Sequence, residues 1–113
     1  MTNDDELGID SDVMRYARAT DPEKLPSLHG DIPDWITDMD RQILHVLMFG
    51  HILTPAIIAE NIDRSRGAVA RRLKTLEAGG FVEKIDRGKY SITAEGGFAV
   101  TGDPDVFEST DKE

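Results

Sequence analysis

The feature that most constrains the fold is a pair of helix starts joined by a very short connection. Thr54-Pro55 places a capping hydroxyl before a proline at the first helical position, and Ser65 can cap the next helix. Only Ile62-Asp63-Arg64 separates the first helix from Ser65. Because so short a turn forces two helices to cross steeply, the sequence predicts a helix-turn-helix, with its second helix over residues 65–78.

The flanking segments predict a third helix and a β-hairpin. Thr37 can cap a helix that ends at Gly50, and a short strand-like run follows at 51–53. Two alternating runs at 81–85 and 89–93 predict strands joined by a turn at 86–88. The residues predicted to face the core are Met39, Ile43, Val46, Leu47, Ile58, Ala59, Ile62, Val69, Leu73, Leu76, Tyr90 and Ile92, whereas His45 is predicted to point away from the first helix's apolar stripe. Trp35 and Ile36 are expected to pack against the first helix or a second subunit.

The charge divides the chain of 113 residues into three parts. Residues 1–36, 37–100 and 101–113 carry net charges of −6, +1 and −4, which together give the formal −9. We therefore expect an acidic N-terminal arm with a possible short helix at 12–19, one small domain over 37–100 and an acidic C-terminal tail. Thr93 is expected to cap only a brief turn, because Gly96-Gly97 favours a frayed tail. The acidic excess fits either a halophile or ordinary disordered tails.

Several classes of function find no support in the residues. The chain has no cysteine, which excludes disulfide scaffolds and thiolate metal sites, and its three histidines lack the helical spacing of metal ligands. No motif for catalysis, a cofactor or a small-molecule ligand is evident, so we expect neither an enzyme nor a metal site. The acidic start and the absence of a long apolar run predict a cytoplasmic protein with no membrane segment.

Residues 65–75 carry the strongest indication of function. They read Ser-Arg-Gly-Ala-Val-Ala-Arg-Arg-Leu-Lys-Thr, and four of the nine residues from Arg66 to Lys74 are basic while none is acidic. The basic tip of the hairpin, with Arg87 and Lys89, follows in the sequence. Such charges can simply solvate the outer face of a helix or a turn. Two basic elements in one small acidic chain instead favour a nucleic-acid interface.

The order and spacing of these elements resemble winged helix-turn-helix regulators of haloarchaea and their phages and, more loosely, the DNA-binding domains of the MarR and Lrp groups. The matching strings are Met-Asp-Arg-Gln-Ile-Leu at 39–44, Leu-Thr-Pro-Ala-Ile-Ile-Ala-Glu-Asn-Ile at 53–62, the run at 65–77 and Gly-Gly-Phe-Val-Glu-Lys at 79–84. The expected fold class is therefore α+β, mainly helical with a small β-hairpin. The acidic termini are expected to be largely mobile.

The resemblance implies that the helix at 65–78 enters the major groove of double-stranded DNA and that the wing at 85–90 contacts the backbone or minor groove. On a helical projection Arg71 faces outward and is the leading candidate for reading guanine, while Arg66 and Arg72 flank the buried stripe and suit phosphates. The full set of expected DNA contacts is Ser65, Arg66, Gly67, Ala68, Arg71, Arg72, Lys74, Thr75, Arg87 and Lys89.

The function expected from this pattern is a sequence-specific transcription regulator, most simply a repressor that occupies an operator as a homodimer. The dimer follows from the resemblance alone. An alternative is a winged-helix adaptor that binds another protein and little or no DNA. In that case the segment at 12–19, or Trp35 and Ile36, would contact the partner.

Overall fold

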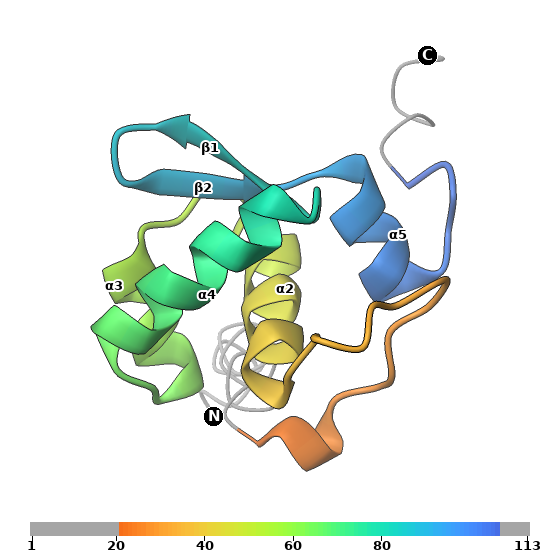
Figure 1. Cartoon of the computed structure of the whole chain (residues 1–113), viewed down its shortest axis with the longest axis horizontal. Helices are drawn as coiled ribbons and strands as arrows, with labels where there is room; N and C mark the ends of the chain where they lie inside the picture. Colours follow the sequence, from red (N-terminus) through yellow and green to blue (C-terminus); the bar gives the residue numbers. More distant parts are fainter. Residues whose placement is uncertain (1–20, 107–113) are drawn as a thin grey trace, which may run out of the picture.

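The computed structural model describes residues 21–106, so the helix expected at 12–19 lies outside the described residues. The elements run in the order η1 (Pro22–Lys24), α2 (Asp38–Gly50), α3 (Pro55–Ile62), α4 (Arg66–Ala78), β1 (Val82–Asp86), β2 (Lys89–Ile92) and α5 (Ala94–Thr101). α2 lies in the middle, with α3 and α5 on either side of it and α4 across its front (Figure 1). This arrangement confirms the predicted winged helix-turn-helix.

The capping residues begin the three predicted helices where the sequence places them. The Thr37 hydroxyl accepts from the Asp40 amide at 3.1 Å, and Asp40 Oδ2 accepts from the Thr37 amide at 3.0 Å, which completes a capping box at the start of α2. The hydroxyl of Thr54 accepts from the Ile57 amide, and that of Ser65 accepts from the Ala68 amide. Each cap satisfies an amide that has no partner within its own helix.

The core forms where the helices and the hairpin meet. All three of the residues predicted to line the inner face of α4, Val69, Leu73 and Leu76, are fully buried. They pack with a cluster that includes Ile43, Leu44, Val46, Leu47, Ile58, Ile62, Val82 and Tyr90. The predicted stripes of α2, α3 and α4 are therefore confirmed, with Met39 and Ile92 only partly buried at the edge of the core.

α4 ends in a tight turn that leads directly into the hairpin. The Phe81 amide donates to the Leu76 carbonyl at 3.0 Å and the Gly80 amide to the Glu77 carbonyl at 3.1 Å, a pair of bonds that defines a Schellman motif. Gly80 takes a φ of 89°, which only glycine adopts without strain. The chain thus turns directly from α4 into β1, as the two glycines predicted.

β1 and β2 form a two-stranded antiparallel sheet, and a β-bridge links β2 to Leu53. The Leu53 amide donates to the Tyr90 carbonyl and the Tyr90 amide to the Leu53 carbonyl, both at 2.9 Å. Of the strand-like run predicted at 51–53, only Leu53 pairs in this way. The bridge ties the hairpin to the connection between α2 and α3, so the wing has a fixed base.

The expectation of a frayed tail after Thr93 is wrong. Thr93 caps α5, a helix of eight residues in which Gly96, Gly97 and Ala99 are buried. A side chain at Gly96 would collide with the Phe81 carbonyl oxygen and with Ile92. Gly96 therefore permits close packing of α5 against the hairpin, although the low helix propensity of glycine suggested that the pair would break a helix.

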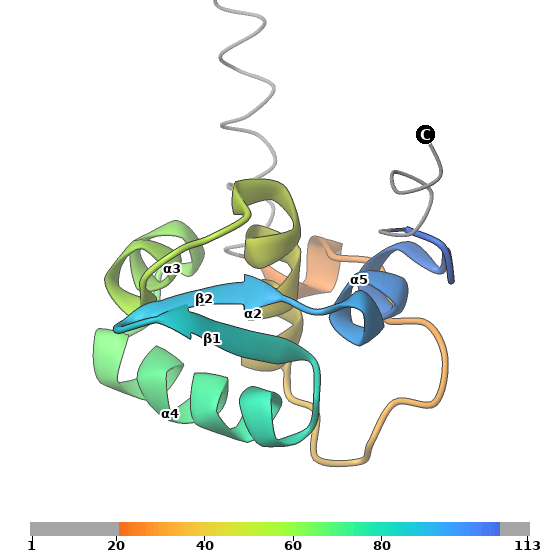
Figure 2. The ribbon, with the colours of Figure 1, turned by 90° about the horizontal axis from the view of Figure 1, so that it is seen from above.

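Residues 21–36 are also part of the packed structure, although the sequence predicted an ordered region beginning only at Thr37. Arg41 donates through its guanidinium to the carbonyls of Leu25, Pro26 and Pro22, and the His29 amide donates to the Ala99 carbonyl at 2.8 Å. Figure 2 shows this arm passing from η1 around α5 to the side that carries α4. Apart from the short η1, the arm is not helical, yet Leu28, Ile32 and Ile36 pack against the core.

His45 is buried, although the sequence placed it away from the apolar stripe of α2. It points away from the main stripe of α2 but is 5% exposed, because α2 is surrounded by other elements and has almost no free face. Its Nδ1 lies 2.8 Å from the Arg41 carbonyl oxygen. Burial lowers the pKa of the imidazole from its ordinary value, which favours the neutral ring. His45 is thus a packing residue.

Candidate nucleic-acid interface

The turn between α3 and α4 presents the start of α4 to solvent. Asp63 adopts the left-handed conformation with a φ of 59°, which Asp tolerates better than most residues. Ser65 then begins α4 with its capping hydrogen bond at 3.1 Å. Arg66 and Gly67 follow, both exposed. The free amides and positive dipole end of α4 are therefore accompanied by a cation and by a residue with no side chain, an arrangement suited to an anion.

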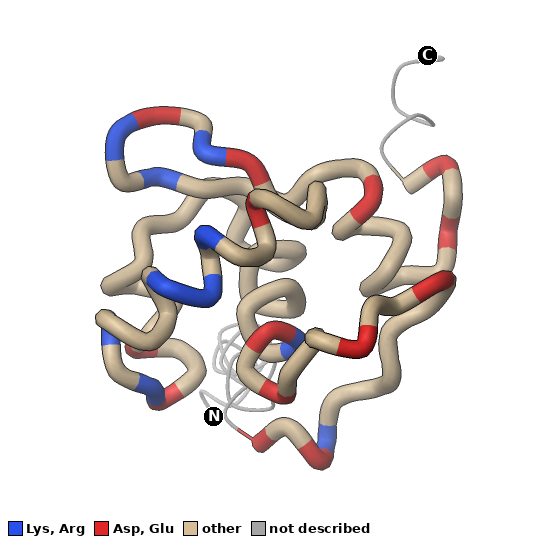
Figure 3. The backbone as a smooth tube through the Cα atoms, in the orientation of Figure 1, with Lys and Arg blue, Asp and Glu red and all other residues tan. Residues whose placement is uncertain are grey.

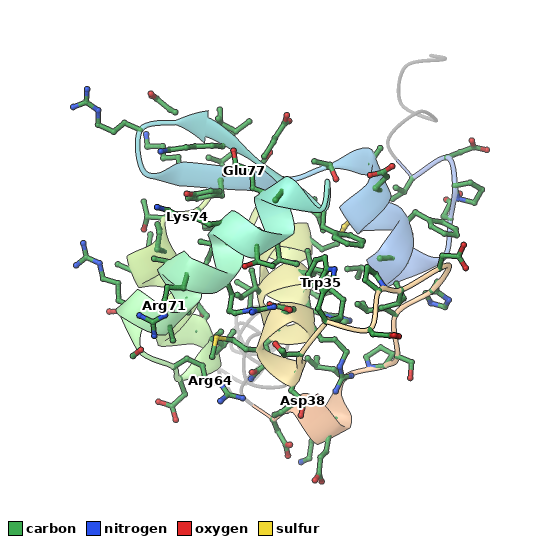
Figure 4. All side chains as sticks on the ribbon, viewed as in Figure 1. Trp35, Asp38, Arg64, Arg71, Lys74 and Glu77 are labelled. Carbon is green, nitrogen blue, oxygen red and sulfur yellow. The ribbon has the colours of Figure 1, made fainter. Side chains whose placement is uncertain are left out.

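The outer face of α4 carries cationic side chains that form no ion pair with another described side chain. Arg66, Arg71 and Lys74 are exposed, and none of their side chains has a hydrogen-bond or ion-pair partner within residues 21–106. Figure 4 shows Arg71 and Lys74 on the side of α4 that faces away from α2. Ala68 and Thr75 are half-buried beside them, and the Thr75 hydroxyl lies 3.4 Å from the Arg71 carbonyl. This face is consistent with the predicted outward set.

Arg72 differs from the sequence-based expectation. Its Nε donates to Asp40 Oδ1 at 2.8 Å, and its Nη2 donates to Asp40 Oδ2 at 2.7 Å. The same Nη2 lies 3.4 Å from the Trp35 carbonyl oxygen. Asp40 is completely buried, and these hydrogen bonds raise the pKa of the Arg72 guanidinium above its ordinary value. We therefore assign Arg72 a structural role, although the sequence suggested that it would contact phosphate.

The Asp40–Arg72 pair fixes α4 to α2. The two parallel hydrogen bonds form a planar fork, and the third acceptor bond of Asp40 comes from the capping box at the start of α2. One carboxylate therefore defines both where α2 begins and how the middle of α4 is oriented. Arg71 precedes Arg72 in the same turn, so the fork also sets the direction in which Arg71 is presented.

The wing supplies a second group of cations. Arg87 and Lys89, both predicted, are exposed at the tip, and Gly88 between them takes a φ of 70°. The register shifts between Lys84 and Asp86, so Ile85 is an extra residue that bends β1 near the tip. Lys84 is exposed and was missed by the sequence analysis. Strict alternation along β1 would place Lys84 on the same face as the buried Val82, two residues earlier, so the sequence pattern gave no signal for its exposure.

Arg64 is a further basic residue that the sequence analysis passed over, because it lies in the turn. Its Nε donates to the Gln42 side-chain oxygen at 3.1 Å, which ties the turn to α2, yet the residue is exposed overall. In Figure 4 its side chain extends from the same end of the molecule as the start of α4. Arg64 thus joins the cations around the N-terminus of α4.

Basic residues gather on one side of the molecule, although Glu77, Glu83 and Asp86 lie among them. Figure 3 shows Lys and Arg along α4 and around the wing, whereas Asp and Glu predominate along the arm and beyond α5. No group of three or more His, Asp or Glu in residues 21–106 is arranged to hold a metal ion. No helix of this part of the chain is long and apolar enough to cross a membrane. The basic side, with α4 and the wing together, is the candidate interface.

Comparison with known protein families agrees with this geometry. A family model described as winged helix-turn-helix phage repressor matches residues 31–110. The chain belongs to that family. The match includes the end of the arm, α2 through α5 and the wing, so it covers the whole candidate interface. Membership identifies a DNA-binding regulator in general, and the family is not a class of enzymes. No curated protein and no solved structure matches the chain.

Proposed function

We propose that this phage-repressor-type protein binds double-stranded DNA sequence-specifically and represses transcription, with α4 in the major groove and the wing on the adjacent backbone or minor groove. The observation that carries the proposal is the row of unpaired cations on the outer face of α4. Free cations on the exposed outer face of a helix are what a phosphate-lined groove requires. The wing, tied at its base by Leu53, extends the same charged surface.

Different residues of this surface are suited to different contacts. Arg71 has a free guanidinium near the middle of α4 and can donate to both acceptors of guanine in the major groove. Arg66 and the capping residue Ser65 lie at the helix start, where phosphate oxygens are favoured. Gly67 leaves room, since even an added Cβ would meet only Arg71 Nη1, at 3.7 Å. Lys74 and Lys89 supply charge without a fixed fork, and Arg87 lies at the tip of the wing, so all three suit the backbone.

Arg71→Ala should reduce discrimination between the operator and unrelated DNA. If Arg71 reads guanine, the loss should be about 1 to 3 kcal/mol for the operator alone. Lys74→Ala should weaken both DNAs alike, because a phosphate contact carries no sequence information. The operator is first selected from random duplexes with the wild-type protein, and each variant is then titrated against the selected and a scrambled duplex at fixed salt.

Arg71→Lys provides the matched control. It keeps the charge but removes the fork, so it should bind unrelated DNA like the wild type and still lose preference for the operator. An Arg71→Ala variant that loses equal affinity for the selected and scrambled duplexes would show that Arg71 acts on the backbone.

We further propose that the protein acts as a homodimer on two half-sites. One short recognition helix contacts few base pairs, and a dimer doubles the sequence it can read. The selected operator should then contain an inverted repeat with its centres about 10 base pairs, or a multiple of that, apart. A selected site with a single, unrepeated motif and a 1:1 complex in sedimentation experiments would contradict the dimer.

Removing residues 1–20 and 107–113 should tighten DNA binding at low salt and change it little in concentrated salt. These segments carry 8 acidic and 3 basic residues, so they oppose the approach of DNA. The Debye length is about 30 Å at 0.01 M salt but about 3 Å at 1 M, so their repulsion acts only at low salt. Arm residues 21–36 are kept because they pack on the core.

The test is the slope of affinity against salt for the full-length and the truncated protein. The truncated protein should bind more tightly at tens of millimolar salt, and the two curves should converge near 1 M. Weaker binding by the truncated protein at every salt concentration would mean that the removed segments contact DNA or support the dimer.

A further inference from the structure

A cavity of about 280 Å³ lies between the arm, the end of α4 and α5. Its apolar walls include Ile32, Phe81 and Phe98, and its polar lining comes from His29, Asp31 and Glu95. Ile32 and Phe98 are half-buried and Phe81 is buried, whereas the three polar residues are exposed. The hollow therefore has an apolar, partly aromatic floor and a polar rim. None of the residues expected to contact DNA lines it.

The fold holds the walls of this cavity in place from three sides. The His29 amide donates to the Ala99 carbonyl at 2.8 Å, which joins the arm to α5. The Thr93 hydroxyl donates to the Gly80 carbonyl at 2.6 Å, which joins the start of α5 to the end of α4. Phe81 is braced by Trp35, whose ring meets it edge-on at 6.1 Å between centroids. A ligand would meet a largely preformed site, as small-molecule sites usually are.

The rim carries uncompensated negative charge. Neither the Asp31 nor the Glu95 carboxylate has a hydrogen-bond or ion-pair partner within residues 21–106, and no Lys or Arg lines the cavity. Two free carboxylates beside two aromatic rings attract a cation with an apolar body and disfavour an anion.

We propose that the cavity binds a small organic cation, an ammonium or guanidinium group attached to an aromatic or aliphatic body. The apolar body would lie against Phe81 and Phe98, and the cationic head would face Asp31 and Glu95. The volume is just below the usual range of about 300 to 1,000 Å³ for ligand pockets, which limits the ligand to a small molecule. This site is separate from the DNA-binding surface and does not depend on the proposed repressor function.

Benzylamine is a suitable probe, and Trp35 is a suitable reporter. Trp35 is the only tryptophan of the chain and touches Phe81 and Gly79, both of which line the cavity. Titration of the full-length protein with benzylamine should change the Trp35 fluorescence in a saturable way and shift the backbone amide resonances of residues 29–32, 79–81 and 95–99. Benzyl alcohol, which has a similar shape without the charge, should bind more weakly, and benzoate should not bind.

Two charge variants separate a specific site from general attraction. Glu95→Gln keeps the shape of the rim and should weaken benzylamine about fivefold, the effect expected for one partly exposed ion pair. Glu60→Gln removes an equal charge from α3, which does not line the cavity, and should leave the affinity unchanged. The proposal is overturned if benzylamine causes no saturable change, if benzyl alcohol binds equally well, or if the two variants behave alike.

Discussion

The Arg72→Ala variant should lose about 3 kcal/mol of unfolding free energy, because it leaves the fully buried carboxylate of Asp40 without its partner. Breaking a buried pair commonly costs about 3 to 5 kcal/mol, and the lower figure applies here because the Arg72 side chain keeps 28% exposure. A small domain is stable by only about 5 to 15 kcal/mol, so the loss should be plain in a urea titration followed by Trp35 fluorescence.

The neighbouring Arg71→Ala substitution is the control. The Arg71 side chain has no partner in the described part of the chain, so its removal should change stability by no more than about 0.5 kcal/mol. Combining Arg72→Ala with Asp40→Asn should recover part of the loss, because the amide no longer needs a cation and can still accept the Thr37 hydrogen bond. An Arg72→Ala variant as stable as the wild type would show that the fork does not hold α4 in solution.

Leu73→Ala should destabilise the fold by about 2 to 5 kcal/mol. Leu73 is fully buried on the inner face of α4, where α4 packs against α2 and α3. The substitution leaves a cavity in a core that has few residues with which to refill it. The midpoint of thermal or urea unfolding reports the loss.

Lys74→Ala is the matched comparison for Leu73, since it lies one residue along α4 and is exposed. It should unfold within about 0.5 kcal/mol of the wild type. Similar midpoints for Leu73→Ala and the wild type would mean that α4 is rotated about its axis. The outward set that contains Arg71 would then be wrong as well.

The parts of the fold that follow local rules could be predicted from the sequence. Thr37, Thr54 and Ser65 cap helices because a hydroxyl before a helix start satisfies a free amide wherever the chain goes next. The stripe of α4 follows in the same way from the helical repeat. These rules depend only on residues three or four positions apart, which the sequence displays directly.

The features that were missed depend on contacts between distant residues. Arg72 looks like its neighbour Arg71 in the sequence, and only the pairing with Asp40, 32 positions earlier, gives it a different role. From the sequence alone Gly96 suggests a helix break, and its role becomes evident only from the structure, where the Phe81 carbonyl lies too close to allow a side chain. Arg41 anchors the arm by binding three carbonyls, an interaction that leaves no repeating pattern in the sequence.

The candidate site shows the same division. The exposed cations of α4 could be inferred from the helical projection, and Arg87 and Lys89 from their place at a hairpin tip. The fork that presents Arg71 and the bulge at Ile85 that bends the wing could not, because each depends on how two segments pair in space. The sequence indicated which cations are exposed, but it did not indicate the contacts that hold these side chains in position.

The most direct test of the central claim, that α4 and the wing form the DNA-binding surface, is the change in backbone amide resonances when the full-length protein binds a selected DNA duplex. The largest changes should fall on residues 65–75 and 87–89, and residues 22–33 and 95–101 should change little. Large changes along the arm and α5, with none in α4, would contradict the account.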